Sequence, residues 1–359
     1  EGTTQRQFDH HLLHQVTYDT VLKAERRLGH AAAARWLTER TQGRGAEFVA
    51  MTGEHAERAG ETALAIDCFE QAGREAEGRF ANAAAVAWTR RALDLLGESQ
   101  APRRFDLLSR LGKIADTLGD RSAQDRLIDE MAALLERHPD DARQADLLFT
   151  RAMLAERRDE GEASERLSWQ AFALAERCGA AQWAAMSQAN LAWLRFVRHD
   201  YLDARRHVQI SLSWFDRMAA GDLRNETRAQ LLTVSAMVST ELCRFAEALD
   251  TLQTVLELGQ QMGRARLQLG ALDGLAMAAA ALGRWPEVAA WGERANTLAQ
   301  SIGATGSVAI AQCHRGRAAM SLDQHASAIR LHEQLLADLR PDASPNIRAG
   351  VLNRLGVSH

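Results

Sequence analysis

Three histidines near the start of the sequence, His10, His11 and His14, have the residue type and spacing to bind a metal ion. His10 and His14 are four residues apart, so they share one face if this stretch is a helix. A metal site also requires a carboxylate or thiolate in the right geometry, and the sequence does not fix one beside these histidines. We therefore predict that they pack between helices, and we predict no metal site in the chain.

The chain contains one Gly-Lys dipeptide, Gly112-Lys113, of the kind found at the end of a phosphate-binding loop. Such a loop needs a Ser or Thr after the lysine, and a glycine five residues before the second glycine. Ile114 and Leu107 stand at these two positions. The motif is therefore missing, and we predict that this chain hydrolyses no ATP and binds no cofactor.

Nucleophiles and paired acids also lack the setting that catalysis requires. Ser187, Ser211 and Ser235 lie within helical patterns, without the sharp strand-to-helix turn that exposes a catalytic hydroxyl. Asp140 and Asp141 follow Pro139, which is typical of the start of a helix. The sequence therefore predicts a binding protein rather than an enzyme.

Composition indicates an ordinary globular chain of 359 residues, with 25% charged residues and a net charge of -4. Arginine pairs such as Arg90-Arg91 are interleaved with acids, so we predict no nucleic-acid binding. Uncharged apolar runs of about 18 residues are absent, so we predict no membrane span. The four cysteines are far apart, which favours reduced core residues in a cytoplasmic protein.

A regular repeat organises most of the chain. A small residue recurs at intervals of 40, with one interval of 44, at Gly112, Ala152, Ala192, Ala236, Ala276, Gly316 and Gly356. A second series keeps the same phase, at Gln124, Ser164, Ala204, Ala248, Val288 and Ala328. Each repeat reads as two helices joined by a tight turn, such as Leu282-Gly283-Arg284-Trp285-Pro286. We predict an all-α solenoid of antiparallel helix pairs, with close helix contacts at the small residues.

The interval of 44 residues contains four additional residues. We place them near Ala219-Ala220-Gly221-Asp222, where one more helical turn of about 3.6 residues keeps the repeat in phase.

The repeat resembles the tetratricopeptide repeat. The shared features are the small residue in the first helix, an aromatic residue after the turn (Tyr201, Phe245, Trp285) and an alanine in the second helix. A period of 40 instead of the usual 34 is closer to the long repeats of STAND-class signal-transduction ATPases, including MalT-like regulators and cyclase-linked ATPases. Those repeats often close with a step such as Cys178-Gly179 or Met262-Gly263. The resemblance implies a right-handed superhelix.

The N-terminal residues follow a different pattern. Phe8 to Tyr18, followed by a basic helix, resembles the last part of the ATPase module of cyclase-linked STAND proteins. The resemblance implies that residues 1–40 are the tail of an ATPase and winged-helix module that binds ATP or ADP upstream. It makes His10 a candidate to face that nucleotide. We predict irregular adapter helices over 41–100, and regular repeats over 101–359 with the last one truncated.

In tetratricopeptide arrays the residues one and four positions after the small residue face a groove. By this resemblance the candidate binding residues are Lys113, Met153, Trp193, Met237, Met277 and Arg317 in the first set, with Phe196 and Met320 in the second. Asp116, Glu156, Thr240 and Ala280 complete the second set. A methionine-rich apolar lining suits an amphipathic helix or an apolar peptide. The alternative is that these side chains pack on each other.

Three functions agree with this pattern. The first is a sensor scaffold of a larger signalling ATPase, which binds a protein or peptide, including its own upstream ATPase domain. The second is the inducer-binding region of a MalT-like transcription activator, with a small-molecule effector. The third is the regulatory region of a nucleotide cyclase.

Overall fold

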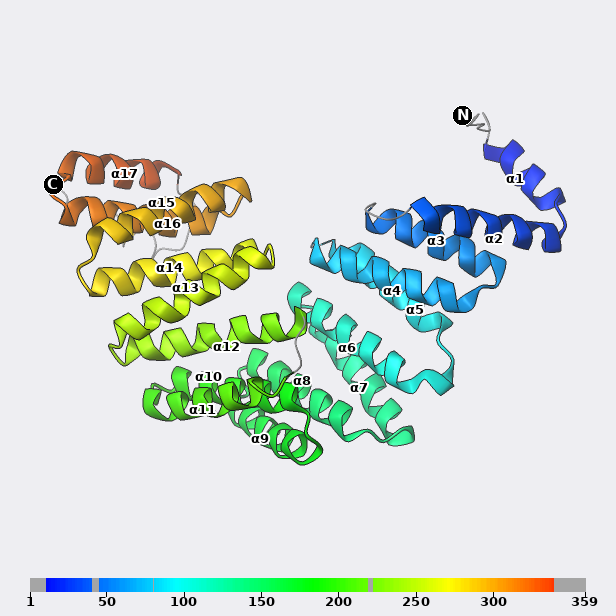
Figure 1. Ribbon diagram of the computed structural model, residues 1–359, viewed down its shortest axis with the longest axis horizontal. Coiled ribbons are helices and arrows are strands. Elements are labelled where there is room, and N and C mark those ends of the chain that lie inside the picture. Colours follow the sequence, from blue (N-terminus) through cyan, green and yellow to red (C-terminus); the bar gives the residue numbers. More distant parts are fainter. Residues whose placement is uncertain (1–10, 41–44, 80, 219–221, 339–359) are drawn as a thin grey trace. The chain divides into compact units, whose positions relative to one another are not determined.

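The computed structural model describes residues 11–40, 45–79, 81–218 and 222–338. Over these residues the chain forms seventeen α-helices and one short 3-10 helix, and no strand (Figure 1). The chain divides into two compact units, Glu1–Arg143 and Gln144–His359. The all-α prediction is confirmed. The domain boundaries predicted near residues 40 and 100 come from changes in the sequence pattern. A division into compact units does not test them, so they stay predictions.

The first unit consists of helices that pack on their neighbours along the chain, α2 on α3, α3 on α4, α4 on α5 and α6 on α7. Its elements are α1 (His11–Thr20), α2 (Lys23–Arg40), α3 (Ala46–Ala59), α4 (Thr62–Gly78), α5 (Asn82–Leu95), η1 (Glu98–Gln100), α6 (Ala101–Leu118) and α7 (Arg121–Arg137). Buried aromatic and aliphatic side chains such as Phe69, Phe105 and Ile114 form its core.

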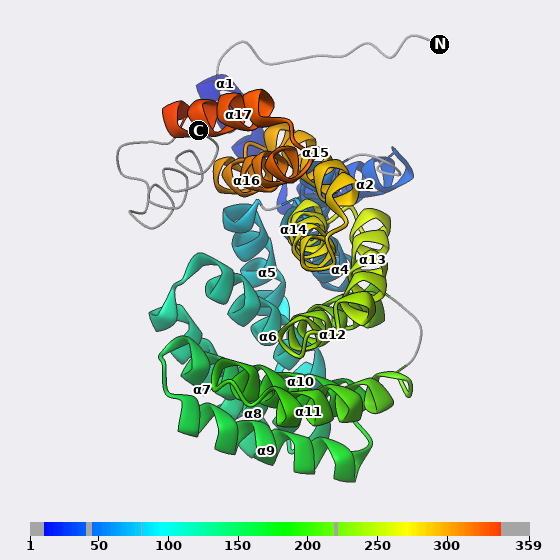
Figure 2. The same cartoon turned by 90° about the vertical axis from the view of Figure 1, so that its left-hand side faces the viewer.

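The second unit is an array of first and second helices that alternate along the chain. The first helices are α8 (Asp141–Arg157), which begins in the last residues of the first unit, α10 (Ala181–Val197), α12 (Asp222–Glu241), α14 (Ala265–Ala281) and α16 (Thr305–Ser321). The second helices are α9 (Gly161–Cys178), α11 (Tyr201–Phe215), α13 (Phe245–Gln261), α15 (Trp285–Ser301) and α17 (His325–Asp338). From α9 onward each helix packs against the next (Figures 1 and 2).

The recurring small residues are the contact points of this array. Ala152, Ala192 and Ala276 are fully buried, and Ala236 is 1% exposed. In the second helices Ser164, Ala204, Ala248, Val288 and Ala328 are also fully buried. A small side chain allows two helix axes to come close together, so the predicted contacts are confirmed at these positions. The prediction is wrong for Gly112, where a Cβ atom would meet no heavy atom within 4 Å.

The turn after each first helix repeats the same backbone geometry. One residue with positive φ follows the helix at Gly119, Asp159, His199, Cys243, Gly283 and Asp323. These positions have the same spacing as the small residues. Four of the six are not glycine, although side chains other than glycine disfavour this conformation.

The longer repeat is accommodated at the start of α12. This helix has 20 residues, whereas α10, α14 and α16 have 17. Asp222 lies 14 residues before Ala236, while Ala265 lies 11 residues before Ala276. The additional helical turn is therefore confirmed. Residues 219–221 of the predicted segment lie outside the described residues.

Polar side chains buried between α9, α10 and α11 hydrogen-bond to each other. The Asn190 side-chain amide donates to the hydroxyls of Ser164 and Ser168, at 3.1 and 2.9 Å. Ser211 donates to the carbonyl of Ala185 at 2.5 Å. Ser187 and Ser211 are fully buried, so neither hydroxyl is accessible to a substrate. Ser211 therefore has a packing role, in agreement with the sequence.

The cysteines differ from the prediction in part. All four are free, and Cys68 is buried between helices of the first unit. Burial raises the pKa of the Cys68 thiol to about 11, so it remains protonated at neutral pH. Cys178 and Cys243 are exposed, however, because Cys178 is the last residue of α9 and Cys243 lies in the turn between α12 and α13. They are not core residues.

The first unit contains a histidine pair that the sequence analysis did not single out. His10 lies outside the described residues, and the side chains of His11 and His14 are not described. Within the described ranges, no group of three or more metal-binding side chains comes together. Instead, His30 and His55 face each other from α2 and α3, with their Nδ1 atoms 2.8 Å apart. The hydroxyl of Tyr18 lies 2.7 Å from Nε2 of His30.

Candidate functional site

One side of the first helices carries the residues that the repeat pattern assigns to a groove. We call this side, which carries Trp193, Met237, Met277 and Arg317, the first-helix face. On α14 the same face continues back through Asp273, Gly270 and Arg266, at helical spacing from Met277. On α16 it continues from Arg317 through His314, Ile310 and Ser307.

A cavity of about 530 Å³ lies between α14 and α16 on this face. We call it the groove cavity. Its lining comes from α14, α15, α16 and the turn before α16, namely Arg266, Leu269, Gly270, Asp273, Ala295, Gly303, Ala304, Ser307, Ile310, Ala311 and His314. Small residues, Gly270, Ala295 and Ala311, leave this space open because none has a side chain long enough to fill it. Most of the lining is apolar.

Two polar side chains of the groove cavity, His314 and Asp273, are joined by a hydrogen bond. Nε2 of His314 donates to Oδ1 of Asp273 over 2.6 Å. The His314 side chain is 12% exposed and the Asp273 side chain 38%. The pair therefore joins the two first helices and leaves a carboxylate within reach of a ligand.

Apolar side chains beside the groove cavity are accessible. Met277 is 49% exposed and Ile310 is 47% exposed. The Arg317 guanidinium lies over the ring of Trp285, 5.5 Å from its centroid, which holds this arginine beside the face. An apolar floor with exposed apolar edges and a few polar groups is typical of a binding site for an apolar segment.

The α10 part of the same face is packed more closely. Trp193 stacks on Phe196 with their ring centroids 5.6 Å apart, and Phe196 packs in turn against Tyr201. The indole nitrogen of Trp193 donates to Oε1 of Glu156 on α8 over 3.2 Å. Trp193, Phe196 and Tyr201 are each partly covered. These residues are thus neighbours on one face, but much of their apolar surface is covered by contacts with each other.

The remaining candidates fall between these two cases. Met153, Met237 and Met320 are half-buried. Lys113 is exposed, and it lies on α6 in the first unit, apart from the array just described. Ala280 is only 5% exposed, so this position of the second set faces the core and not a groove. A binding role for the eight candidates stays a prediction.

Sequence reasoning missed the residues that form the groove cavity itself. Asp273, Ile310 and His314 lie three to seven residues before the predicted positions Met277 and Arg317. The signal was present, because positions separated by three, four and seven residues share a helix face. Extending each predicted position back by two turns would have found them.

Several solved structures have a similar fold. The STAND protein (Signal Transduction ATPase with Numerous Domains) with a tetratricopeptide repeat sensor from Pyrococcus horikoshii has a TM-score of 0.67 at 12% sequence identity, over 93% of this chain and 49% of that one. The apo form of RapI has a TM-score of 0.60 at 8% identity, over 82% and 81% of the two chains. A Rap protein in complex with Competence and Sporulation Factor has a TM-score of 0.50 at 13% identity, over 83% and 87%.

This chain has a tetratricopeptide-like repeat fold. The resemblance seen in the sequence is therefore confirmed for the fold. Sequence identities this low do not extend the resemblance to function. The chain spans about half the length of the STAND protein that it matches. No protein-family model and no curated protein sequence matches it. In the part of the chain that the structure describes, no helix is long and apolar enough to cross a membrane.

Proposed function

We propose that the chain is a protein-binding repeat scaffold, and that the groove cavity holds an apolar side chain of a bound peptide or amphipathic helix. The observation that carries this proposal is the open space between α14 and α16, with an apolar floor and with Met277 and Ile310 exposed at its edges. Burying one aliphatic anchor there contributes about 1.5 to 3 kcal/mol. Methionine adapts to partners of irregular shape, which suits Met277 to the edge of such a site.

The polar groups give the bound segment a direction. The remaining oxygen of Asp273 can accept a hydrogen bond from a lysine, an arginine or a backbone amide of the partner. Arg317, beside the face, can pair with an acidic residue further along the partner. A segment with an apolar anchor between a basic and an acidic residue fits this arrangement best.

Similar structures support the proposal at the level of fold. One of the Rap structures contains a bound factor, and the STAND protein is described as having a repeat sensor. We propose the corresponding role here, in which occupancy of the repeat face is relayed to an ATPase domain that binds ATP or ADP. The relay requires only that the partner binds one arrangement of the domains more tightly than the other. A MalT-like activator and a nucleotide cyclase remain the alternatives, and the full-length sequence would separate them.

The test is peptide selection followed by affinity measurement. A helical peptide selected from a display library on the whole chain should bind with saturation, and the double variant Met277→Glu, Ile310→Glu should weaken binding by about tenfold or more. Ile210→Glu is the matched control, because Ile210 is 39% exposed on the second helix α11. Binding that survives the double variant, with the melting temperature unchanged, would contradict the proposal. A second double variant, Trp193→Glu with Met237→Glu, tests whether the site extends to α10 and α12.

A further inference from the structure

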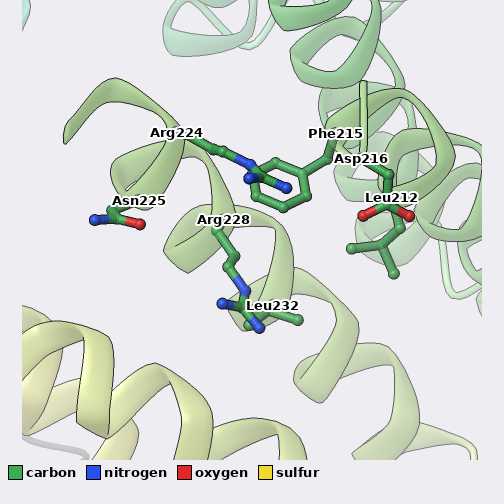
Figure 3. Close-up of a pocket in the computed structure, with 7 residues that line it drawn as sticks. All are labelled: Leu212, Phe215, Asp216, Arg224, Asn225, Arg228 and Leu232. Carbon is green, nitrogen blue, oxygen red and sulfur yellow. The ribbon is translucent and has the colours of Figure 1, made fainter. Parts of the chain in front are cut away.

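A second cavity lies between the end of α11 and the start of α12, and we call it the joint cavity (Figure 3). Its volume is about 400 Å³. The lining residues are Leu212, Phe215, Asp216, Arg224, Asn225, Arg228 and Leu232. Arg228 lies nine residues before Met237, which places it on the opposite side of α12 from the first-helix face. The joint cavity is therefore separate from the groove cavity.

The joint cavity follows from the irregular repeat. Helix α12 begins one turn early, whereas α11 has only 15 residues and ends sooner than α13 and α15, which have 17. The first turn of α12 consequently extends beyond the last turn of α11. A space remains between them, and Arg224 and Arg228 of α12 border it.

Arg224 is held in place at this space. Its guanidinium lies over the ring of Phe215, 4.8 Å from the centroid (Figure 3). The Nε atom of Arg224 is buried and donates to no acceptor within the described part of the chain. A buried donor without a partner is costly, so an acceptor from a ligand would stabilise this arrangement.

Arg228 extends the positive charge by one turn of the same helix face. Neither arginine forms an ion pair among the described residues, whereas Arg195 of α10 pairs with both Glu165 and Asp203. Asp216 is the one acid in the lining, and with two arginines it leaves a net charge of one positive. An anion with a single negative charge would neutralise the cavity.

We infer that the joint cavity binds a small organic carboxylate with an apolar body. Its carboxylate accepts hydrogen bonds from the guanidinium groups of Arg224 and Arg228, which is the geometry that arginine favours. Its apolar body packs on Leu212, Phe215 and Leu232. A phosphate dianion fits less well, because Asp216 opposes a second negative charge and the apolar lining would lack a partner. A bound carboxylate would also tie α12 to α11.

Calorimetric titration of the whole chain with 4-phenylbutyrate tests this inference. The matched neutral amide, 4-phenylbutanamide, and inorganic phosphate are the comparison ligands. We expect the carboxylate to bind with saturation and about tenfold more tightly than the amide. In Arg228→Gln the affinity for the carboxylate should fall by roughly tenfold to a hundredfold. Arg206→Gln is the control, since Arg206 is 77% exposed on α11 and does not line the cavity.

Four results would overturn the inference. They are no saturable binding of the carboxylate, equal binding of the amide, tighter binding of phosphate, and full affinity in Arg228→Gln. Arg224→Gln is a second variant, and circular dichroism would show whether it folds. If Arg224→Gln does not fold, Arg228→Gln decides the test alone, because Arg228 is exposed and its replacement leaves the core intact. Loss of peptide binding at the groove cavity would leave this result unaffected.

Discussion

Two stretches of the first-helix face differ, although Trp193 of one and Met277 of the other occupy the same position of the repeat. On α10 the aromatic ring of Trp193 lies on Phe196, and its nitrogen bonds to Glu156. On α14 and α16, Met277 and Ile310 are about half exposed beside an open cavity. The position of a residue in the repeat thus determines the face of the helix on which it lies. The side chains around that residue determine whether it stabilises the protein or remains accessible to a partner.

Truncating one residue in each stretch should give the largest contrast. Trp193→Ala should lower the free energy of unfolding by about 2 kcal/mol, because it removes a stacked, partly buried ring. Met277→Ala should lower it by no more than about 0.5 kcal/mol, because the side chain is 49% exposed. Urea denaturation of both variants measures the difference. Equal losses would mean that the two stretches are packed alike.

Glycines of α14 provide a finer comparison. Gly270 is exposed on a helix, and a Cβ atom there would meet no heavy atom within 4 Å. Gly270→Ala should therefore stabilise the protein by about 0.5 to 1 kcal/mol, because alanine favours the helix. At Gly274 a Cβ atom would lie 2.9 Å from Cδ1 of Leu252, so the same change should bring no such gain. Thermal unfolding of the two variants checks this. A higher melting temperature for Gly274→Ala would show that Leu252 on α13 moves aside more easily than the packing indicates.

The hydrogen bond between His314 and Asp273 in the groove cavity should make a smaller contribution. A double-mutant cycle of Asp273→Asn and His314→Gln should give a coupling energy of about 0.5 kcal/mol, because Asp273 is partly exposed and screened by solvent. If the coupling were several times larger, Asp273 would have to be desolvated, and the cavity would be less accessible than proposed.

The partly buried pair of His30 and His55 makes the stability of α2 and α3 depend on pH. In the second unit burial also lowers the pKa of His207, on α11. Burial lowers the pKa of His30 and of His55 from the ordinary value of 6.5, and His55, Arg58 and Arg26 lower that of His30 further. Glu54 acts in the opposite direction on His55. Below about pH 6.5 the unfolded chain therefore binds more protons than the folded one, so stability is present above this pH and is lost as the pH falls.

Hydrogen exchange measures this pH effect in the whole chain. Amides of α2 and α3 should lose protection between pH 7.5 and pH 5.5, relative to those of α14, after correction for intrinsic exchange. His55→Gln should reduce this dependence, whereas His138→Gln should not, since His138 is exposed. An equal loss of protection in α2, α3 and α14 would contradict the prediction, because the pH effect would then not originate at His30 and His55.

Periodic features of this molecule could be predicted from the sequence. The contacts at Ala192 and Ala276 and the additional turn of α12 follow from spacing alone, because the recurring small residues mark where helices pack closely. Accessibility could not be predicted. The contact between His30 and His55 joins residues on different helices, and no spacing rule brings them together. The repeat places Trp193 and Glu156 on one face, but spacing alone does not show that they bond to each other. The joint cavity could not be predicted either, because it depends on where α11 ends and where α12 begins.

The connectors with positive φ indicate how this chain could be made more robust. His199 and Cys243 adopt a left-handed backbone that costs a side chain other than glycine about 1 kcal/mol. Each connector lies one repeat from the next, so glycine at several of them should raise the melting temperature in independent steps. The architecture already tolerates glycine there, at Gly119 and Gly283. An engineered thermostable version could therefore retain every helix, and with them both cavities, unchanged.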